Sequence, residues 1–148
     1  MKHFMVRLFC LFVLLFLSFL TVSSQETATV YFEKAIVLQQ EGEYETSVLL
    51  CTKAIELDST LTGVYFLRGY NFYLLKNYRE AIKDFTKAIS LKPDYFEAWY
   101  YRSKARQARG DMIGSLSDLN QSRHINPVNT TFLVAKGIFT SIFGGSDN

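Results

Sequence analysis

The sequence repeats itself with a period of 34 residues, and this feature constrains the fold more than any other. The segment AIKDFTKAISLKP at 81–93 has counterparts in SVLLCTKAIELDS at 47–59 and SLSDLNQSRHINP at 115–127. In this register large side chains align with large ones and small with small, which chance does not maintain over three copies. A chain with such a period folds as a stack of similar units. The aligned sets include Tyr31, Tyr65, Trp99 and Leu133; Ala35, Gly69, Ser103 and Gly137; and Ala54, Ala88 and Ser122.

The spacing within each copy is helical. Apolar residues recur at steps of three and four, as in 82–89, which is typical of amphipathic helices. Short polar turns divide each copy, and Gly42 and Gly110 suit a position of positive φ after a helix. Pro93 and Pro127 should end the second helices of their copies, because proline cannot continue the hydrogen-bond ladder. The helices are expected at about 28–41, 44–57, 62–75, 78–91, 96–109, 112–125 and 130–142.

These features resemble the tetratricopeptide repeat: the period of 34, the aromatic Tyr65 before the small Gly69, and the spacing of Ala81, Phe85, Ala88 and Pro93. The resemblance implies an all-α, right-handed α-solenoid of three helix-turn-helix repeats at 28–61, 62–95 and 96–129. The second copy matches best. The third departs most, since it has Arg106 in place of an aromatic residue, and we expect looser packing there.

The last expected helix, at 130–143, would cap the exposed end of the third repeat, and the tail at 144–148 is expected to be disordered. This helix is unusually apolar, so a second interpretation stays open. It could instead serve as a dimerisation helix or lie on a membrane surface. The residues that give it this character are Phe132, Ile138, Phe139, Ile142 and Phe143.

The N-terminal segment resembles an export signal. Lys2 and Arg7 precede an uncharged run at 8–22, and small polar residues follow, which is the layout of a secretory signal peptide at 1–24. The run is shorter than the roughly 20 residues that span a bilayer comfortably, but an uncleaved signal anchor stays open. Either way the rest of the chain would be exported. We expect a bacterial periplasm first, and secretion or an outward-facing anchor otherwise.

The charges argue against nucleic acid as a partner. Without Lys2 and Arg7, 14 basic residues balance 14 acidic ones, so the exported chain lacks the excess of positive charge that nucleic-acid binding needs. The charge is nevertheless polarised along the chain. Residues 25–61 carry 7 acidic and 2 basic residues, 62–95 carry 3 and 6, and 96–148 carry 4 and 6.

No group of residues predicts catalysis. His124 is expected at a helix end, where a positive charge would complement the helix dipole, and Cys51 aligns with core positions. No set of residues has the spacing of metal ligands, and no motif predicts a cofactor. The basic residues of the expected helix at 96–109 should be solvated, or should form a local site for an acidic partner; they are Arg102, Lys104, Arg106 and Arg109. We therefore expect a chain that is not an enzyme.

The resemblance also indicates where a partner would bind, because the first helices of such repeats line a concave groove. A protein or extended peptide could bury its side chains against aromatic residues there. Alternatively, the N-terminal segment or the last helix covers these rings, or the rings form part of a thicker core. The expected groove residues are Phe32, Ile36, Phe66, Tyr70, Tyr73, Tyr100 and Lys104.

Some members of this family hold a peptide's C-terminal carboxylate in a clamp of lysine, asparagine and arginine. The corresponding residues here cannot form that clamp, which disfavours an adaptor for chaperone tails. The functional hypothesis is an exported binding module without catalysis. The alternative is a self-assembling or membrane-associated scaffold that acts through its C-terminal helix, and membrane contact is expected only there or at the N-terminus. The clamp positions hold Phe32, Ile36, Leu67, Glu97 and Tyr101.

Overall fold

The computed structural model describes the backbone of residues 28–143 and the side chains of residues 28–136. This part of the chain is helical, without any strand. The first helix spans 28–40. It is followed by α2 (Tyr44–Leu57), α3 (Thr62–Leu74), α4 (Tyr78–Leu91), α5 (Phe96–Ala108), α6 (Met112–Ile125) and α7 (Pro127–Phe143).

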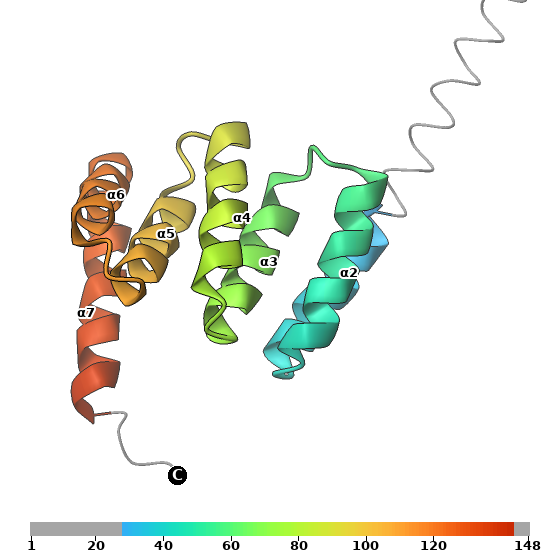
Figure 1. Ribbon diagram of the computed structural model, residues 1–148, viewed down its shortest axis with the longest axis horizontal. Coiled ribbons are helices and arrows are strands. Elements are labelled where there is room, and N and C mark those ends of the chain that lie inside the picture. The colour runs from blue at the N-terminus through green and yellow to red at the C-terminus, as the bar shows by residue number, and fades with distance from the viewer. Residues whose placement is uncertain (1–27, 144–148) are drawn as a thin grey trace, which may run out of the picture.

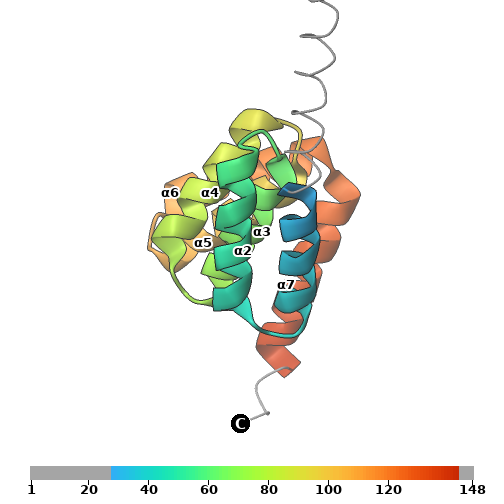
Figure 2. The same ribbon diagram turned by 90° about the vertical axis from the view of Figure 1, so that its right-hand side faces the viewer.

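The helices stack side by side in chain order, from the first helix to α7 (Figure 1). A view along the stack separates two layers, with α2, α4 and α6 on one side and the first helix and α7 on the other (Figure 2). Each helix therefore packs against its partner in the repeat and against the next repeat. The result is the solenoid of paired helices that the repeat predicted.

The helix boundaries follow the sequence pattern closely except at the last helix. The second helices of the three pairs begin and end where the spacing predicted. The expected start of the last helix at 130 was wrong, because Pro127 is already the first residue of α7. A proline fits this position, where its missing N–H would have no partner within the helix. Only Asn126 thus separates α6 from α7.

One turn connects the two helices of each pair, and the three turns are equivalent. Each turn contains one residue in the left-handed conformation, with positive φ. Gly42 has φ 85° and Gly110 has φ 83°, as their positions predicted. In the middle repeat Lys76 takes this conformation, with φ 59°. A side chain with a Cβ is strained there, so the middle turn is less favourable than the other two.

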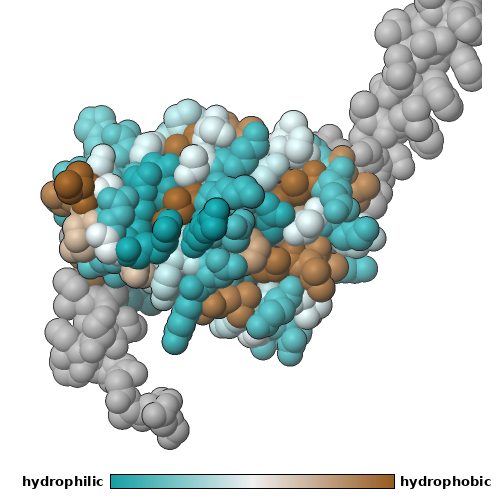
Figure 3. All heavy atoms as spheres, in the orientation of Figure 1, coloured by the Kyte–Doolittle hydropathy of each residue, from teal (hydrophilic) through white to brown (hydrophobic). Residues whose placement is uncertain are grey.

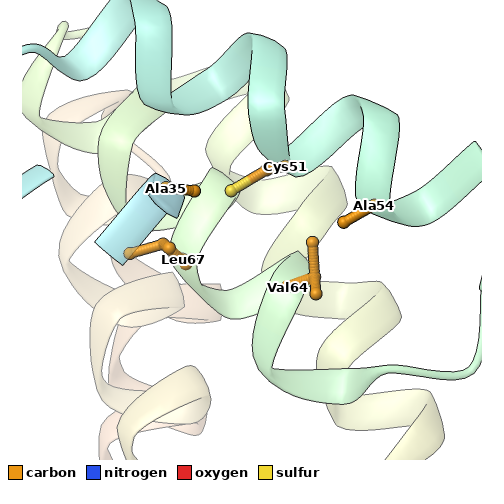
Figure 4. Packing of buried hydrophobic residues seen from close by; sticks show 5 residues of the cluster. All are labelled: Ala35, Cys51, Ala54, Val64 and Leu67. Carbon is orange, nitrogen blue, oxygen red and sulfur yellow. The ribbon is translucent and has the colours of Figure 1, made fainter. Parts of the chain in front are cut away.

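The core lies between successive helix pairs. Cys51 and Ala54 of α2 and Ala35 of the first helix are fully buried against Val64 and Leu67 of α3, and Figure 4 shows these side chains converging. Small residues on α2 let α3 approach closely, while the larger ones fill the space between them. The same arrangement continues at later interfaces, through Tyr65, Ala88, Ile89 and Ala98 and through Ala81, Phe85 and Ala105.

Several predictions lie outside the described residues. These are the signal peptide or anchor at 1–24 and the tail at 144–148, together with the side chains of Ile138, Phe139, Ile142 and Phe143. Among the helices of residues 28–143, none is long and apolar enough to cross a membrane.

Candidate partner-binding surface

An aromatic cluster joins α3 and α5. It consists of Phe66, Tyr70 and Tyr73 on α3 and Tyr101 on α5, all of them partly exposed. The rings of Phe66 and Tyr70 stack with centroids 6.3 Å apart, and those of Tyr70 and Tyr73 lie 6.5 Å apart. The spacing of these residues along α3 places them on one side of that helix. Three of the seven predicted groove residues therefore form one continuous surface.

Tyr101 holds this aromatic cluster together. Its ring packs edge-on against Tyr70 at 4.8 Å and lies within 6.0 Å of Phe66 and Tyr73. Burial, together with the neighbouring Tyr70, raises the pKa of Tyr101 well above its ordinary value. Burial also raises the pKa of Tyr73. The hydroxyl of Tyr73 thus stays protonated at neutral pH and is able to donate a hydrogen bond to a partner.

The sequence pattern placed Tyr100 in the groove, but the structure places it under α7. Its ring is only 5% exposed, and its hydroxyl donates a hydrogen bond to the carbonyl oxygen of Leu133 at 3.0 Å. The expectation that a partner could reach this ring is therefore wrong. Of the interpretations that the sequence left open, coverage by the last helix holds at this position.

The remaining predicted groove residues lie on the first helix and on α5. Phe32 and Ile36 pack on the edge of the core between the first helix and α3, and both are partly exposed. The ring of Phe32 covers Gly63, where an added Cβ would meet it at 3.0 Å. Lys104 is partly exposed on α5, one turn beyond Tyr101. It is a positive charge close to the aromatic cluster.

Two ion pairs with buried carboxylates were not predicted from the sequence. Arg68 donates from Nε and Nη2 to both carboxylate oxygens of Asp84, at 2.7 and 2.8 Å, and from Nη1 to the hydroxyl of Thr52 at 3.1 Å. The same three bonds recur 34 residues later among Arg102, Asp118 and Thr86. The 34-residue repeat aligns threonine with threonine, arginine with arginine and aspartate with aspartate at these positions, so the sequence did contain a signal for the two ion pairs. Their regular recurrence indicates a structural role between repeats.

The expectation that the basic residues of α5 are solvated was wrong for two of them. Arg102 is buried in its ion pair, with its guanidinium 4.7 Å from the centroid of the Trp99 ring. Arg106 donates to Asp118 at 2.9 Å and lies 3.7 Å from the carboxylate of Asp111. These contacts occupy the third repeat where the sequence suggested loose packing. Asp118 already neutralises the charge of Arg102, so this arginine cannot pair with an acidic partner.

The described residues offer no group with the geometry of a reactive centre. Burial raises the pKa of the Cys51 thiol to about 12, which suppresses its reactivity. His124 is exposed near the end of α6. Within the described part of the chain, no three His, Cys, Asp or Glu residues come close enough to hold a metal ion. The aromatic cluster is the surface that calls for a functional explanation.

Comparison with known proteins identifies the repeat. Family models described as tetratricopeptide repeat match 28–61 and 64–95. Residues 28–61 and 64–95 are tetratricopeptide repeats. The matched segments correspond to the first two helix pairs. The third pair, α5 and α6, continues the tetratricopeptide stack in the structure, with the Arg102–Asp118 pair in the place of Arg68–Asp84.

Curated relatives match over part of their length. The heat shock protein sti1 homolog of Schizosaccharomyces pombe is 34% identical over 75 residues, which cover 51% of this chain and 13% of that protein. The mitochondrial import receptor subunit TOM70 of Rattus norvegicus is 30% identical over 105 residues, covering 68% of this chain and 17% of the receptor. The chain thus spans less than a fifth of the length of these relatives.

Solved tetratricopeptide structures share the fold. The Arabidopsis OM64 TPR domain superimposes with a TM-score of 0.73 at 23% identity, covering 81% of this chain and 99% of that domain. The first TPR of Spaghetti (RPAP3), bound to the HSP90 peptide SRMEEVD, gives a TM-score of 0.70 at 23% identity and covers 76% of this chain and 90% of that one. Both likenesses confirm the all-α tetratricopeptide solenoid.

Proposed function

We propose that this chain is a non-catalytic interaction module that binds a protein or an extended peptide on its aromatic cluster. The observation that carries the proposal is the row of partly exposed rings Phe66, Tyr70 and Tyr73, braced by Tyr101. Aromatic side chains supply a large contact area at a low cost in conformational entropy, and they dominate the energetics of many interfaces. Phe32, Ile36 and Lys104 would extend the contact along the first helix and α5.

The partner proposed here is a largely uncharged segment. The solved structure of RPAP3 contains a peptide with the acidic ending EEVD. The positions where a carboxylate clamp would lie here hold no basic residue, and Ile36 and Glu97 are among them. A carboxylate would lose its hydration at such positions without gaining a cationic partner. We therefore favour apolar partner side chains against the rings, with backbone carbonyls accepting hydrogen bonds from the tyrosine hydroxyls.

Export belongs to the same proposal. The positive residues before the apolar run at 8–22 support a signal peptide or a signal anchor, so the partner is proposed to meet the module outside the cytoplasm. We favour the bacterial periplasm. Labelling the protein with a reagent that does not cross membranes would separate exported from cytoplasmic protein in intact cells.

Site-specific photo-crosslinking tests the binding surface. The crosslinker replaces Tyr70 in the chain expressed with its own N-terminal segment, and the matched control replaces Lys83, which is exposed on α4. The proposal would be supported by a polypeptide that is captured from position 70 alone. That polypeptide should co-purify with the unaltered chain but not with the Tyr70→Ala, Tyr73→Ala double variant. Capture of the chain's own C-terminal helix at position 70 would overturn it.

A further inference from the structure

Two valines on the first helix are exposed although the matching residues in later repeats are buried. Val30 is 47% exposed, whereas Val64 is fully buried. Val37 is 52% exposed, whereas Ala105 is fully buried. These residues share positions in the 34-residue register. The first helix therefore presents to solvent a surface that the other repeats cover.

The covered counterparts show what this surface is built to contact. Val64 packs against Cys51 and Ala54 of the preceding α2, and Ala105 packs against Ala81 and Phe85 of the preceding α4. In both cases the neighbour is the second helix of the repeat before. The exposed side of the first helix is thus apolar at the positions that, in later repeats, pack on the second helix of the preceding repeat. We call it the N-terminal face, defined by Val30 and Val37.

The opposite end of the stack exposes a matching surface. Met112 and Leu116 on α6 are each 60% exposed. Their counterparts on α4, Tyr78 and Ile82, pack against the cluster that includes Ala105 of the following repeat. Met112 and Leu116 lie on the side of α6 that would face a further repeat, and we call them the C-terminal face.

Among the residues whose side chains are described, the hydrogen bonds between α7 and α6 lie near the C-terminal end of α6. Thr130 is hydrogen-bonded to Ser122, in the last turn of α6, through a hydroxyl-to-hydroxyl distance of 2.9 Å and a bond of 3.0 Å to the Ser122 carbonyl oxygen. The first turns of α6, with Met112 and Leu116, stay exposed. Figure 3 shows a hydrophobic patch at the α6 end of the stack, and further hydrophobic patches among hydrophilic side chains across the same face.

The charges of the two ends are opposite. Residues 28–61 carry 6 acidic and 2 basic residues, whereas 96–136 carry 3 acidic and 6 basic ones. The turn beside Val37 contributes the exposed Glu41 and Glu43, and the turn before Met112 contributes the exposed Arg109. The two turns occupy equivalent places in their repeats, so stacking two copies end to end would bring these charges together.

We infer that a second copy of this chain docks its N-terminal face on the C-terminal face of the first, so that the protein self-associates head to tail. Val37 of one copy packs on Leu116 and Met112 of the other, while Glu41 and Glu43 lie beside Arg109. At Val37 this contact repeats the packing between repeats inside the chain, whereas Thr130 of α7 holds the end of α6 and Val30 lies at the edge of the contact. It leaves the aromatic cluster free, and it is independent of the proposed partner binding.

Charge decides between the geometries that a self-association could take. A symmetric dimer through two N-terminal faces would bring two acidic ends together, and one through two C-terminal faces would bring two basic ends together. A head-to-tail contact pairs opposite charges. Because it uses different surfaces on the two copies, each added copy offers a free face for the next, which generates a filament or a closed ring.

Sedimentation velocity tests the inference on the chain expressed with its own N-terminal segment. The average mass should rise with protein concentration, and more steeply at low salt than at high salt. Val37→Glu and Leu116→Glu should each weaken association about tenfold or more, because each buries an unpaired charge. Leu49→Glu is the matched control, since Leu49 is 66% exposed on α2 at a position that is exposed in every repeat.

Mixing the two variants distinguishes head-to-tail contact from a symmetric dimer. The Val37→Glu chain keeps its C-terminal face and the Leu116→Glu chain keeps its N-terminal face, so the mixture should form one-to-one pairs and nothing larger. Arg109→Glu, at an exposed residue that packing does not constrain, should weaken association without affecting the fold. A monomer at every concentration, or unchanged association of either single variant, would overturn the inference.

Discussion

Arg102 and Asp118 form a buried, bidentate ion pair, with Nε and Nη2 of the arginine 2.8 and 2.7 Å from the two carboxylate oxygens. The third nitrogen of the guanidinium, Nη1, donates to the hydroxyl of Thr86 on the preceding repeat at 3.0 Å. One side chain thus connects α4, α5 and α6. Because Arg68 repeats this geometry with Asp84 and Thr52, the polar contacts fix the angle between successive repeats as regularly as the apolar core does.

Removing the carboxylate of Asp118, which Arg102 and Arg106 share, should destabilise the fold. Asp118→Asn leaves the buried guanidinium of Arg102, 9% exposed, without its counter-charge, and also takes an ion pair from Arg106. We expect the free energy of unfolding to fall by about 3–5 kcal/mol, measured by urea denaturation. Glu80→Gln is the control, because its ion pair with Lys83 is exposed and should contribute less than about 1 kcal/mol. Equal effects of the two substitutions would argue against this role of Asp118.

The three turns provide a matched test of backbone strain. Lys76 has positive φ where the other repeats have glycine, so Lys76→Gly should raise the free energy of unfolding by about 0.5–1 kcal/mol. Gly42→Ala should lower it by a similar amount, since a Cβ there meets no atom within 4 Å and only the backbone conformation is penalised. Thermal unfolding of both variants checks the signs, and a destabilised Lys76→Gly protein would contradict the prediction.

The period predicted the helices because it aligns residues by size, and size decides how closely two helices approach. Ala54, Ala88 and Cys51 are buried as that alignment required. The start of α7 was missed for a physical reason. A proline stops one helix and begins another equally well, so Pro127 alone cannot show how short the connection is.

The candidate site was predicted only in part. The rings of Tyr70 and Tyr73 lie together because their spacing on α3 fixes their side of the helix. The burial of Tyr100 depends on how α7 docks, which no spacing within α5 reveals. The ion pairs were missed because charged residues are almost always exposed unless they are paired. Only the joint recurrence of Arg68 with Asp84 and of Arg102 with Asp118 indicates pairing.

The packing of α3 on α4 should require glycine at position 69. A Cβ added there would approach Cβ of Asp84 and Cδ1 of Phe85 at 3.1 Å. Gly69→Ala should therefore lower the free energy of unfolding by about 1–3 kcal/mol. The first and third repeats hold larger residues at this position, Ala35 and Ser103, because smaller side chains replace the phenylalanine that they face.

A double variant separates this overpacking from a general loss of stability. Phe85→Leu alone removes core volume and should destabilise the protein, but it also makes room for the alanine. The double variant should lose less stability than the sum of the two single variants, since the residues are in contact. Additive losses in urea denaturation would show that the contact between Gly69 and Phe85 does not limit the packing of α3 on α4.

The buried thiol of Cys51 should make stability fall at alkaline pH. Burial raises its pKa from 9.0 to about 12 in the folded chain, so folding favours the protonated thiol. Its contribution is fully present below about pH 9 and is lost as the pH rises toward 12, with a slope of up to about 1.4 kcal/mol per pH unit. Tyr95 has a pKa raised from 10.0 to about 12 by burial and adds a second decline that begins near pH 10.

Urea denaturation across this range should therefore show Cys51→Ala starting its decline about one pH unit later than the unaltered chain. If both chains begin to lose stability at the same pH, the thiol is not the group responsible.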